Sequence, residues 1–352
     1  MGEVLRGSVS TEVMRKAADE HWQELLDLPN VHGIGVGETG VCLFVNQKLP
    51  LDELAPAERI PSVLKIEVGD QIVNVPTDVI VRPALVIGEL TDGLPTGWVD
   101  RQRPVRPGFS AQSENMAKDR GTLGAIIVKN GKLCLLSCAH VFVKDPFTAG
   151  AADNIIQPSS GDKGASPRDR IGTVVDYTVF KTTGVNTVDA AIASLGPSIK
   201  ASDEFPHYGK LKGHYTEVRQ NWRLKLVGAT TKYVEAHVQR LDVREKITYM
   251  VGGKPKSAVF HGLVEMNHIN LPGYPDVPAG QPGDSGALWV SEDSYACLLH
   301  VASHPQGDFG YGILIDRVLK RFGNAKLWGG RGLADGEEPI ELPGVDPAEV
   351  GR

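Results

Sequence analysis

The feature that most constrains the fold of this chain is a series of short apolar runs separated by turn-forming residues. Such runs fill residues 121–322: LGAIIV, KLCLLSCAHVFV, AAIASL, RLKLVGA, ALWV, ACLLHVA and YGILI. Runs of this length suit β-strands, and the 40 glycines and 23 prolines of the 352-residue chain supply turns between them. The region therefore predicts a mainly β fold, as barrels or a sandwich, and only IDRVLKRF near its end is typical of a helix.

The N-terminal part of the chain has a different pattern. Apolar residues recur at near-helical spacing from Thr11 to Leu28, where Pro29 closes the run. The segments that follow are typical of short strands: VHGIGVG, VCLFVNQKL, KIEVG and IVNVPTDVIV. We therefore expect a small α+β domain over residues 1–87.

Composition along the chain predicts the remaining boundaries. Residues 88–103 are rich in proline, glycine and charge, as linkers are. Residues 104–325 hold the strand-like runs and form the predicted β domain. The acidic, proline-bearing residues 326–352 have little to bury and are predicted to be a tail.

Charge and hydropathy exclude several classes of partner. The net charge of −6 includes no long basic run, so we expect no nucleic-acid partner. No apolar stretch approaches the ~20 residues of a membrane helix. The first residues, MGEVLRGSVSTEVMRKAADEHW, lack the apolar region of a signal peptide, so we expect a cytoplasmic protein with no membrane partner.

The four cysteines are too few and too scattered for a disulfide framework, and they form no CxxC pair. We therefore expect free buried thiols. Cys138 lies two residues before His140, which leaves a Cys–His dyad as a minor alternative. Alternation along a strand puts both side chains on one face without aligning the sulfur to a ring nitrogen.

One segment can supply a nucleophile and the donors that it needs. In QPGDSGALW, glycines on both sides of Ser285 permit a tight turn that exposes its hydroxyl. The backbone NH groups of Gly283 and Ser285 can converge on one point, as an oxyanion hole requires. The same residues also suit an ordinary β-turn, so the segment alone does not decide between the two readings.

Two further motifs favour catalysis. The apolar run LLSCAHV ends near His140, and Asp189 opens the apolar run in TVDAAIASL. Acyl transfer by serine needs an imidazole that takes the hydroxyl proton and a carboxylate that orients the imidazole. His140, Asp189 and Ser285 therefore form the predicted catalytic triad.

In these motifs the chain resembles the trypsin-like serine peptidases, which share Ala-His after an apolar strand, Asp before Ala/Ile residues, and GDSG. The interval from His140 to Asp189 is 49 residues and that from Asp189 to Ser285 is 96 residues, and both are similar to those of that family. RPVRPGFS, GTLGAIIV, LLSCAHV and the N-terminal VHGIGVG look like an intracellular bacterial branch related to plant narrow-leaf proteases.

The resemblance implies a chymotrypsin-like fold: two antiparallel β-barrels with the site between them. His140 and Asp189 would come from the first barrel and Ser285 from the second. The implied activity is serine endopeptidase cleavage of a protein or peptide substrate, with no cofactor and no metal.

The chain departs from the family pattern where secreted members are activated. No IVGG-like activation site precedes the domain, so a freed amino terminus is not expected to pair with Asp284. We expect an internal basic or hydrogen-bonding partner for Asp284 instead, with Arg103 and Arg106 as candidates by sequence proximity.

The resemblance also suggests the residues that bind substrate. Ala279, six residues before Ser285, would lie at the base of the specificity pocket, so an acidic base for Arg or Lys substrates is not expected. Val301, Ala302 and Ser303 would form the edge of the pocket. This pattern favours a small or apolar residue on the acyl side of the scissile bond.

The histidines near the end of the domain suggest a metal only weakly. His300 and His304 are four residues apart, which brings two ligands together on a helix but not on a strand. We therefore assign no metal.

Two other functions stay open beside the active endopeptidase. A fold does not fix a function, so the chain can instead be an inactive scaffold that binds a protein partner. It can also be a latent peptidase that a regulatory partner activates, and a homo-oligomer is compatible with either.

Overall fold

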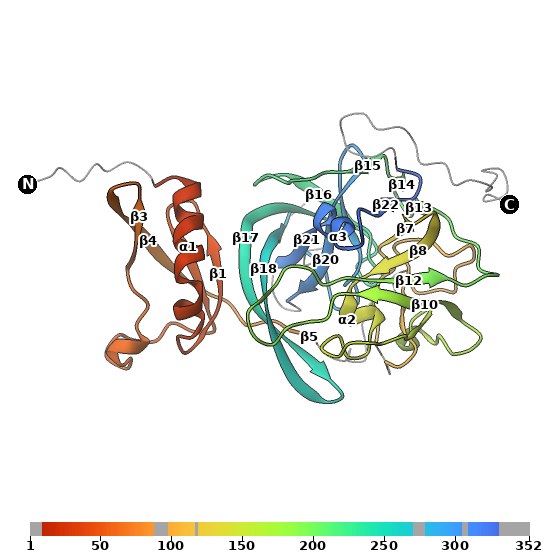
Figure 1. The fold of residues 1–352 in the computed structure, drawn as a ribbon, viewed down its shortest axis with the longest axis horizontal. Coiled ribbons are helices and arrows are strands. Elements are labelled where there is room, and N and C mark those ends of the chain that lie inside the picture. Colours follow the sequence, from red (N-terminus) through yellow and green to blue (C-terminus); the bar gives the residue numbers. More distant parts are fainter. Residues whose placement is uncertain (1–8, 88–97, 117–118, 270–278, 305–308, 331–352) are drawn as a thin grey trace, which may run out of the picture.

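The computed structural model describes residues 9–87, 98–116, 119–269, 279–304 and 309–330. These residues form an N-terminal α+β unit followed by two β-barrels, with the N-terminal unit beside the second barrel (Figure 1). The prediction of a mainly β chain that begins with a small α+β unit is confirmed.

The first barrel is a seven-stranded sheet in the order β22-β7-β8-β12-β10-β9-β6. The chain before β6 hydrogen-bonds to the chain before β7, which closes the sheet: Ala111 N donates to Gly121 O and Leu123 N donates to Phe109 O, each at 2.9 Å. Its strands are β6 (Gln112–Ser113), β7 (Ala125–Lys129), β8 (Lys132–Ser137), β9 (Asn154–Ile156), β10 (Arg170–Tyr177), β12 (Ala191–Leu195) and β22 (Lys326–Leu327).

The second barrel is a closed ring of six antiparallel strands in the order β18-β21-β20-β19-β16-β17, with β17 pairing back onto β18. Gly252 and Gly253, both at positive φ, turn the chain between β17 and β18. The two strands form a hairpin that extends well beyond the ring (Figure 1). The strands are β16 (Arg223–Leu226), β17 (Val234–Val251), β18 (Lys254–His268), β19 (Leu288–Ser291), β20 (Tyr295–Ser303) and β21 (Phe309–Leu314).

The N-terminal unit packs one helix against four strands. Ser10 caps the helix by accepting from Val13 N, and the helix buries Met14, Ala17, Ala18 and Leu25 against the sheet. The elements are α1 (Thr11–Leu26), β1 (Val31–Val36), β2 (Val41–Val45), β3 (Val63–Val68) and β4 (Gln71–Val81), with a short 3₁₀ turn at Pro56–Glu58. The predicted helix over residues 11–28 is confirmed, and it ends two residues earlier, at Leu26.

The N-terminal sheet continues directly into the second barrel. Strand β1 pairs with β17, Gly33 opposite Glu245 and Ile34 opposite Arg244. A Cβ on Gly33 would lie 2.2 Å from the carboxylate of Glu245, so only glycine permits this close approach. The unit is therefore part of the same sheet as the barrel and not a separate layer.

A buried ionic cluster joins the two parts at this junction. The guanidinium of Arg82 lies 3.0 Å from Glu265 and 3.7 Å from Glu245, hydrogen-bonds to Tyr311 Oη and packs over the ring of Phe44. Glu245 also accepts from His32 at 2.6 Å. Burial of these charges is tolerated because each one is paired.

Two predicted segment boundaries shift in the structure. Residues 98–103 of the predicted linker pack on the first barrel, where Arg101 Nε bonds to Asp169 and Gln102 N to Gln157. Lys326–Leu327, predicted to begin the tail, form β22 and pair with β7. The linker residues 88–97 and the tail residues 331–352 lie outside the described residues.

The remaining elements are short. They are β5 (Val86–Ile87), α2 (Ala139–Phe142), β11 (Val185–Asn186), β13 (Glu204–Phe205), β14 (Gly209–Lys210), β15 (Gly213–His214), α3 (Ile315–Arg321) and a 3₁₀ turn at Ser160–Asp162. The helix α3 confirms the prediction at IDRVLKRF. Among the described helices, none has the length and apolar character needed to cross a membrane. All four cysteines are free and buried, as predicted.

Candidate active site

His140 lies in α2, the single helical turn that follows β8. Its side chain is 7% exposed, and its Nδ1 lies 2.5 Å from Asp189 Oδ2. This contact leaves Nε2 as the nitrogen that can accept a proton from a nucleophile.

Asp189 reaches His140 because β12, which begins two residues later, pairs with β8. The register places Ala191 opposite Ser137, next to α2. Asp189 is fully buried, and its Oδ1 accepts from the NH groups of Ala139 at 2.7 Å and His140 at 3.3 Å. These bonds hold the carboxylate in place for His140.

The second barrel adds a residue that the sequence analysis missed. Tyr249 of β17 donates from Oη to Asp189 Oδ2 at 3.4 Å, and its ring lies 5.6 Å from that of His140. Burial and the neighbouring Asp189 carboxylate raise the pKa of Tyr249 well above its ordinary value, so the hydroxyl stays a donor. Its strand is too mixed in character to have signalled this contact.

Ser285 lies in the turn before β19, between two glycines at positive φ, Gly283 and Gly286. Its hydroxyl donates to Val301 O at 2.9 Å. Within the described residues, His140 Nε2 is buried and has no hydrogen-bond partner. The structure therefore brings Ser285 and His140 to one cavity without a hydrogen bond between them.

The turn around Ser285 is held by two hydrogen bonds from Thr122. Thr122 N donates to Ser285 O at 2.9 Å, and Thr122 Oγ1 donates to Gly283 O at 2.8 Å. The NH groups of Gly283 and Ser285 donate no hydrogen bond to any other described residue. Both predicted oxyanion donors are therefore free to bind an oxygen.

Asp284 has backbone partners in place of the predicted arginines. Its carboxylate accepts from the NH groups of Thr230 at 2.9 Å, Thr231 at 3.1 Å and Gln281 at 2.8 Å. Complete burial raises its pKa, and the three backbone donors oppose that rise. The sequence analysis expected either a basic or a hydrogen-bonding internal partner for Asp284, and the structure has the second kind.

The two arginines suggested as partners of Asp284 bind elsewhere. Arg103 hydrogen-bonds to Gln157, and Arg106 to the backbone oxygen of Glu204. Proximity in sequence failed here because both arginines lie in the loop that leads into the first barrel. The NH groups that bind Asp284 include those of Thr230 and Thr231, which lie in the loop after β16 of the second barrel.

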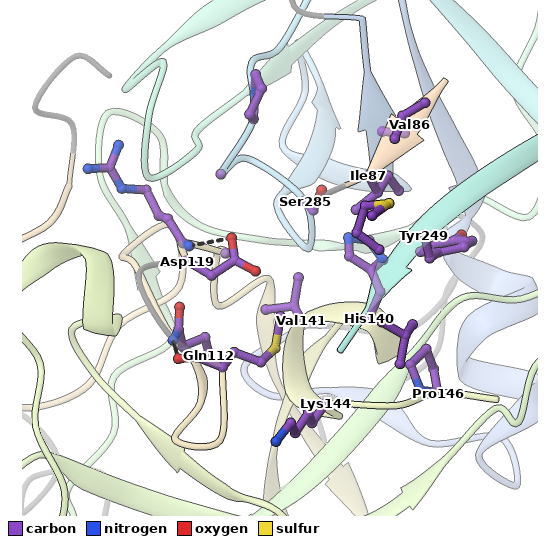
Figure 2. Close-up of a pocket in the computed structure, with 18 of the residues that line it drawn as sticks. Val86, Ile87, Gln112, Asp119, His140, Val141, Lys144, Pro146, Tyr249 and Ser285 are labelled. Carbon is purple, nitrogen blue, oxygen red and sulfur yellow. Dashed lines mark hydrogen bonds between the residues drawn. The ribbon is translucent and has the colours of Figure 1, made fainter. Parts of the chain in front are cut away.

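A cavity of about 640 Å³ opens between the two barrels and contains both His140 and Ser285. Figure 2 shows Ser285 and His140 facing this space, with Tyr249, Val86 and Ile87 on one side and Gln112 and Asp119 on the other. A cavity of this size fits several residues of an extended peptide.

The predicted pocket residues divide into two groups. Ala302 and Ser303 line the cavity, whereas Ala279 and Val301 are fully buried, and Val301 presents its backbone oxygen to Ser285. Ser303 Oγ also lies 2.8 Å from Nε2 of the buried His300. The predicted pocket edge at Ser303 therefore carries a polar group, the Ser303 hydroxyl, which is paired with a buried imidazole.

Three groups at this site that could hold a metal, the Cys138 thiol, His140 Nδ1 and the Asp189 carboxylate, already have hydrogen-bond partners among the described residues. Cys138, His140 and Asp189 each have one possible ligand atom within 4.8 Å of the others. The Cys138 thiol, however, donates to His300 O at 3.2 Å, and burial and the Asp189 charge raise its pKa well above the ordinary value. The neutral thiol is a poor nucleophile, so a Cys–His dyad is not supported.

The fold and the site together define a double-barrel β protein with histidine, aspartate and serine at the barrel junction. The sequence matches no known family profile and no curated protein. Similar solved structures include Thermobifida fusca protease A, at 15% identity over 63% of this chain and 98% of that chain, with a TM-score of 0.43.

Two other similar structures are also named as proteases. One is a chymotrypsin of Cellulomonas bogoriensis, at 14% identity over 63% of this chain and 97% of that chain, with a TM-score of 0.42. The other is a glutamic-acid-specific serine protease described as using a histidine triad in substrate binding, at 16% identity over 64% of this chain and all of that chain, with a TM-score of 0.43. Likenesses of this degree leave the function of this chain to be argued from its own residues.

Proposed function

We propose that this protein is a serine endopeptidase whose catalytic residues are His140, Asp189 and Ser285. The observation that carries the proposal is the buried pair of Asp189 and His140, 2.5 Å apart, in which His140 lines the same cavity as Ser285. A buried carboxylate that fixes one imidazole nitrogen leaves the other to act as a base towards a neighbouring hydroxyl.

In the proposed reaction, Ser285 Oγ attacks the carbonyl carbon of the scissile peptide while its proton passes to His140 Nε2. The NH groups of Gly283 and Ser285 bind the oxyanion, and Asp189 stabilises the charged imidazole. His140 then gives the proton to the leaving amine, and a water molecule hydrolyses the acyl-enzyme by the same steps. Protein or peptide substrates follow from this chemistry.

The backbone anchoring of Asp284 supports activity without cleavage of the chain. Three NH groups hold its carboxylate, so the turn that carries Gly283 and Ser285 needs no new amino terminus to fix it. Free cysteines support the proposed cytoplasmic location, because thiols persist in a reducing compartment. The resemblance to the intracellular bacterial branch of trypsin-like proteins agrees with that location.

A second candidate, a latent or inactive peptidase fold that binds a protein partner, is favoured by one contact. Ser285 Oγ donates to Val301 O and not to His140 Nε2. Catalytic hydrogen bonds are often formed only when substrate binds, so this contact is also compatible with an active enzyme. In the second candidate, a regulatory partner or a second copy of the chain would move the Ser285 hydroxyl to His140.

Labelling of the full chain by a fluorophosphonate probe tests the two candidates. We expect the wild type to label at Ser285 and the Ser285→Ala and His140→Ala variants not to label. Ser257→Ala is the matched control, because Ser257 lies on β18 and is absent from the cavity lining. A folded wild type that does not label would refute the active enzyme and favour the latent or inactive candidate.

A further inference from the structure

Strand β5 is the last described part of the N-terminal segment, and it lies in the candidate active site. Val86 and Ile87 pair in parallel with Thr248 and Tyr249 of β17, and Thr248 N donates to Leu85 O at 3.1 Å. Leu85 is buried in the core of the barrels, which anchors the strand. The N-terminal segment therefore supplies a fixed piece of the cavity wall.

The side chains that this wall presents are apolar, and two of them are exposed. Val86 is 60% exposed and Met250 is 40% exposed, and both line the cavity together with Ile87 and Val251. Beyond Val251 the hairpin turns at Gly252 and Gly253, where an added Cβ would meet open space. Apolar side chains exposed at a cavity mark a binding surface more often than isolated ones elsewhere.

The wall is continuous with the catalytic residues. Ile87 is opposite Tyr249, whose hydroxyl contacts the carboxylate that holds His140. In Figure 2, Val86, Ile87 and Tyr249 lie on the His140 side of the cavity, and Ser285 faces the same space. A peptide bound across Ser285 would therefore pass beside this surface.

We propose that Val86, Ile87, Met250 and Val251 form a binding site for an apolar side chain of the substrate peptide, close to the scissile bond. The inference rests on the proposed function, because it takes a peptide as the occupant of the cavity. It gives the N-terminal segment a direct role in substrate selection. Bulky aliphatic residues such as leucine suit the site, because they bury apolar surface against the wall without leaving a polar group unpaired.

The test changes the wall without touching the catalytic residues. Val86→Asp puts a charge where an apolar side chain would bind, and its exposure keeps the cost to folding small. Val175→Asp is the matched control, because Val175 is 56% exposed on β10 and is absent from the cavity lining. Quenched fluorescent peptides that carry one leucine, moved along a glycine and serine background, report the preferred position.

We expect wild type to prefer leucine at one position, and Val86→Asp to lose that preference, with kcat/KM for the best peptide down by about tenfold or more. Fluorophosphonate labelling should keep its wild-type rate in this variant, because the small probe does not reach the wall. Unchanged leucine preference in Val86→Asp, or an equal loss in Val175→Asp, would overturn the inference. Faster peptide cleavage by Val86→Asp would also overturn it, since that result means that another segment or protein covers the wall.

Peptide binding separates this inference from the proposed function. Fluorescein-labelled peptides from the same set are titrated into Ser285→Ala, with and without Val86→Asp, and followed by anisotropy. Leucine-dependent binding that Val86→Asp removes supports the site even when wild type fails to label. Binding that ignores leucine overturns it even when wild type is active.

Discussion

Lowering the pH should destabilise the protein through one buried histidine. His300 is fully buried, its Nδ1 accepts from Trp289 Nε1 at 3.1 Å, and its Nε2 lies 2.8 Å from Ser303 Oγ. Burial lowers the pKa of His300 to about 3, and the nearby His140 acts in the same direction. In the unfolded chain a histidine titrates with a pKa of about 6.5.

The sign of the effect follows from where the proton binds. Between these two pKa values the unfolded chain takes up a proton and the folded chain does not, so acid favours unfolding. The contribution of the neutral, buried His300 to the free energy of unfolding is fully present above pH 6.5 and is lost as the pH falls towards 3. A pH of 5 is about 1.5 units below the pKa of the histidine in the unfolded chain. The free energy of unfolding is therefore lower by about 2 kcal/mol at pH 5 than at neutral pH. A folded pKa one unit higher would leave this figure nearly unchanged, because the folded histidine would still be neutral at pH 5.

Urea unfolding of wild type and His300→Asn at pH 7 and pH 5 measures this loss. Asparagine places an oxygen near the position of Nδ1, so it can accept from Trp289 without taking up a proton. We expect the stability advantage of wild type over the variant to shrink by about 2 kcal/mol between the two pH values. Ser303→Ala, which keeps the imidazole, should retain the wild-type pH dependence. An advantage of wild type over His300→Asn that is equal at pH 7 and pH 5 would refute the argument.

Three further substitutions test the turn and the junction. Asp284→Asn replaces one of two oxygens that accept from backbone NH groups with an NH₂ donor, so we expect a loss of about 1–3 kcal/mol in urea unfolding and no fluorophosphonate labelling. Wild-type labelling would show that the turn does not depend on this carboxylate. Gly286→Ala would place a Cβ 2.1 Å from the Ser137 side chain at a φ of +95°, so we expect a lower melting temperature and no fluorophosphonate labelling. A wild-type melting temperature and wild-type labelling would contradict the close packing. Arg82→Met removes the guanidinium that the buried Glu245 and Glu265 share, although His32 still contacts Glu245 and Arg240 still contacts Glu265. It should cost about 3 kcal/mol in urea unfolding, of which Glu245→Gln in the same chain should restore part; no restoration would mean that the loss is not electrostatic.

The residues of the candidate site could be proposed from the sequence because their chemistry leaves a local pattern there. Gly283 and Gly286 flank Ser285 because the turn needs positive φ, and Asp189 opens an apolar strand because its neighbours are core residues. Six of the seven strand-like runs in residues 121–322 became the strands β7, β8, β12, β16, β19 and β20, and YGILI became part of β21. Local patterns of this kind do not depend on the rest of the molecule.

The long hairpin could not be predicted in the same way. Strands β17 and β18 span 18 and 15 residues, but charged residues interrupt their apolar pattern. Two of these residues, Glu245 and Glu265, are buried, and their partners include Arg82 and His32 of the N-terminal unit as well as Arg240 of the hairpin itself. Ion pairs between residues as far apart in the sequence as Arg82 and Glu245 leave no periodic pattern of apolar residues.

This junction also bears on how the endopeptidase proposal can be examined. Removing the N-terminal unit would take Arg82 and His32 away from Glu245 and leave buried charge without its partners. It would also remove β5 from the cavity wall and expose the edge of β17 that pairs with β1. Inactivity of a barrel-only fragment would therefore report a damaged fold or a missing wall, and would not show that the N-terminal unit is an activator. Single substitutions in the full chain, such as Val86→Asp, separate these effects because the ionic cluster and the shared sheet stay in place.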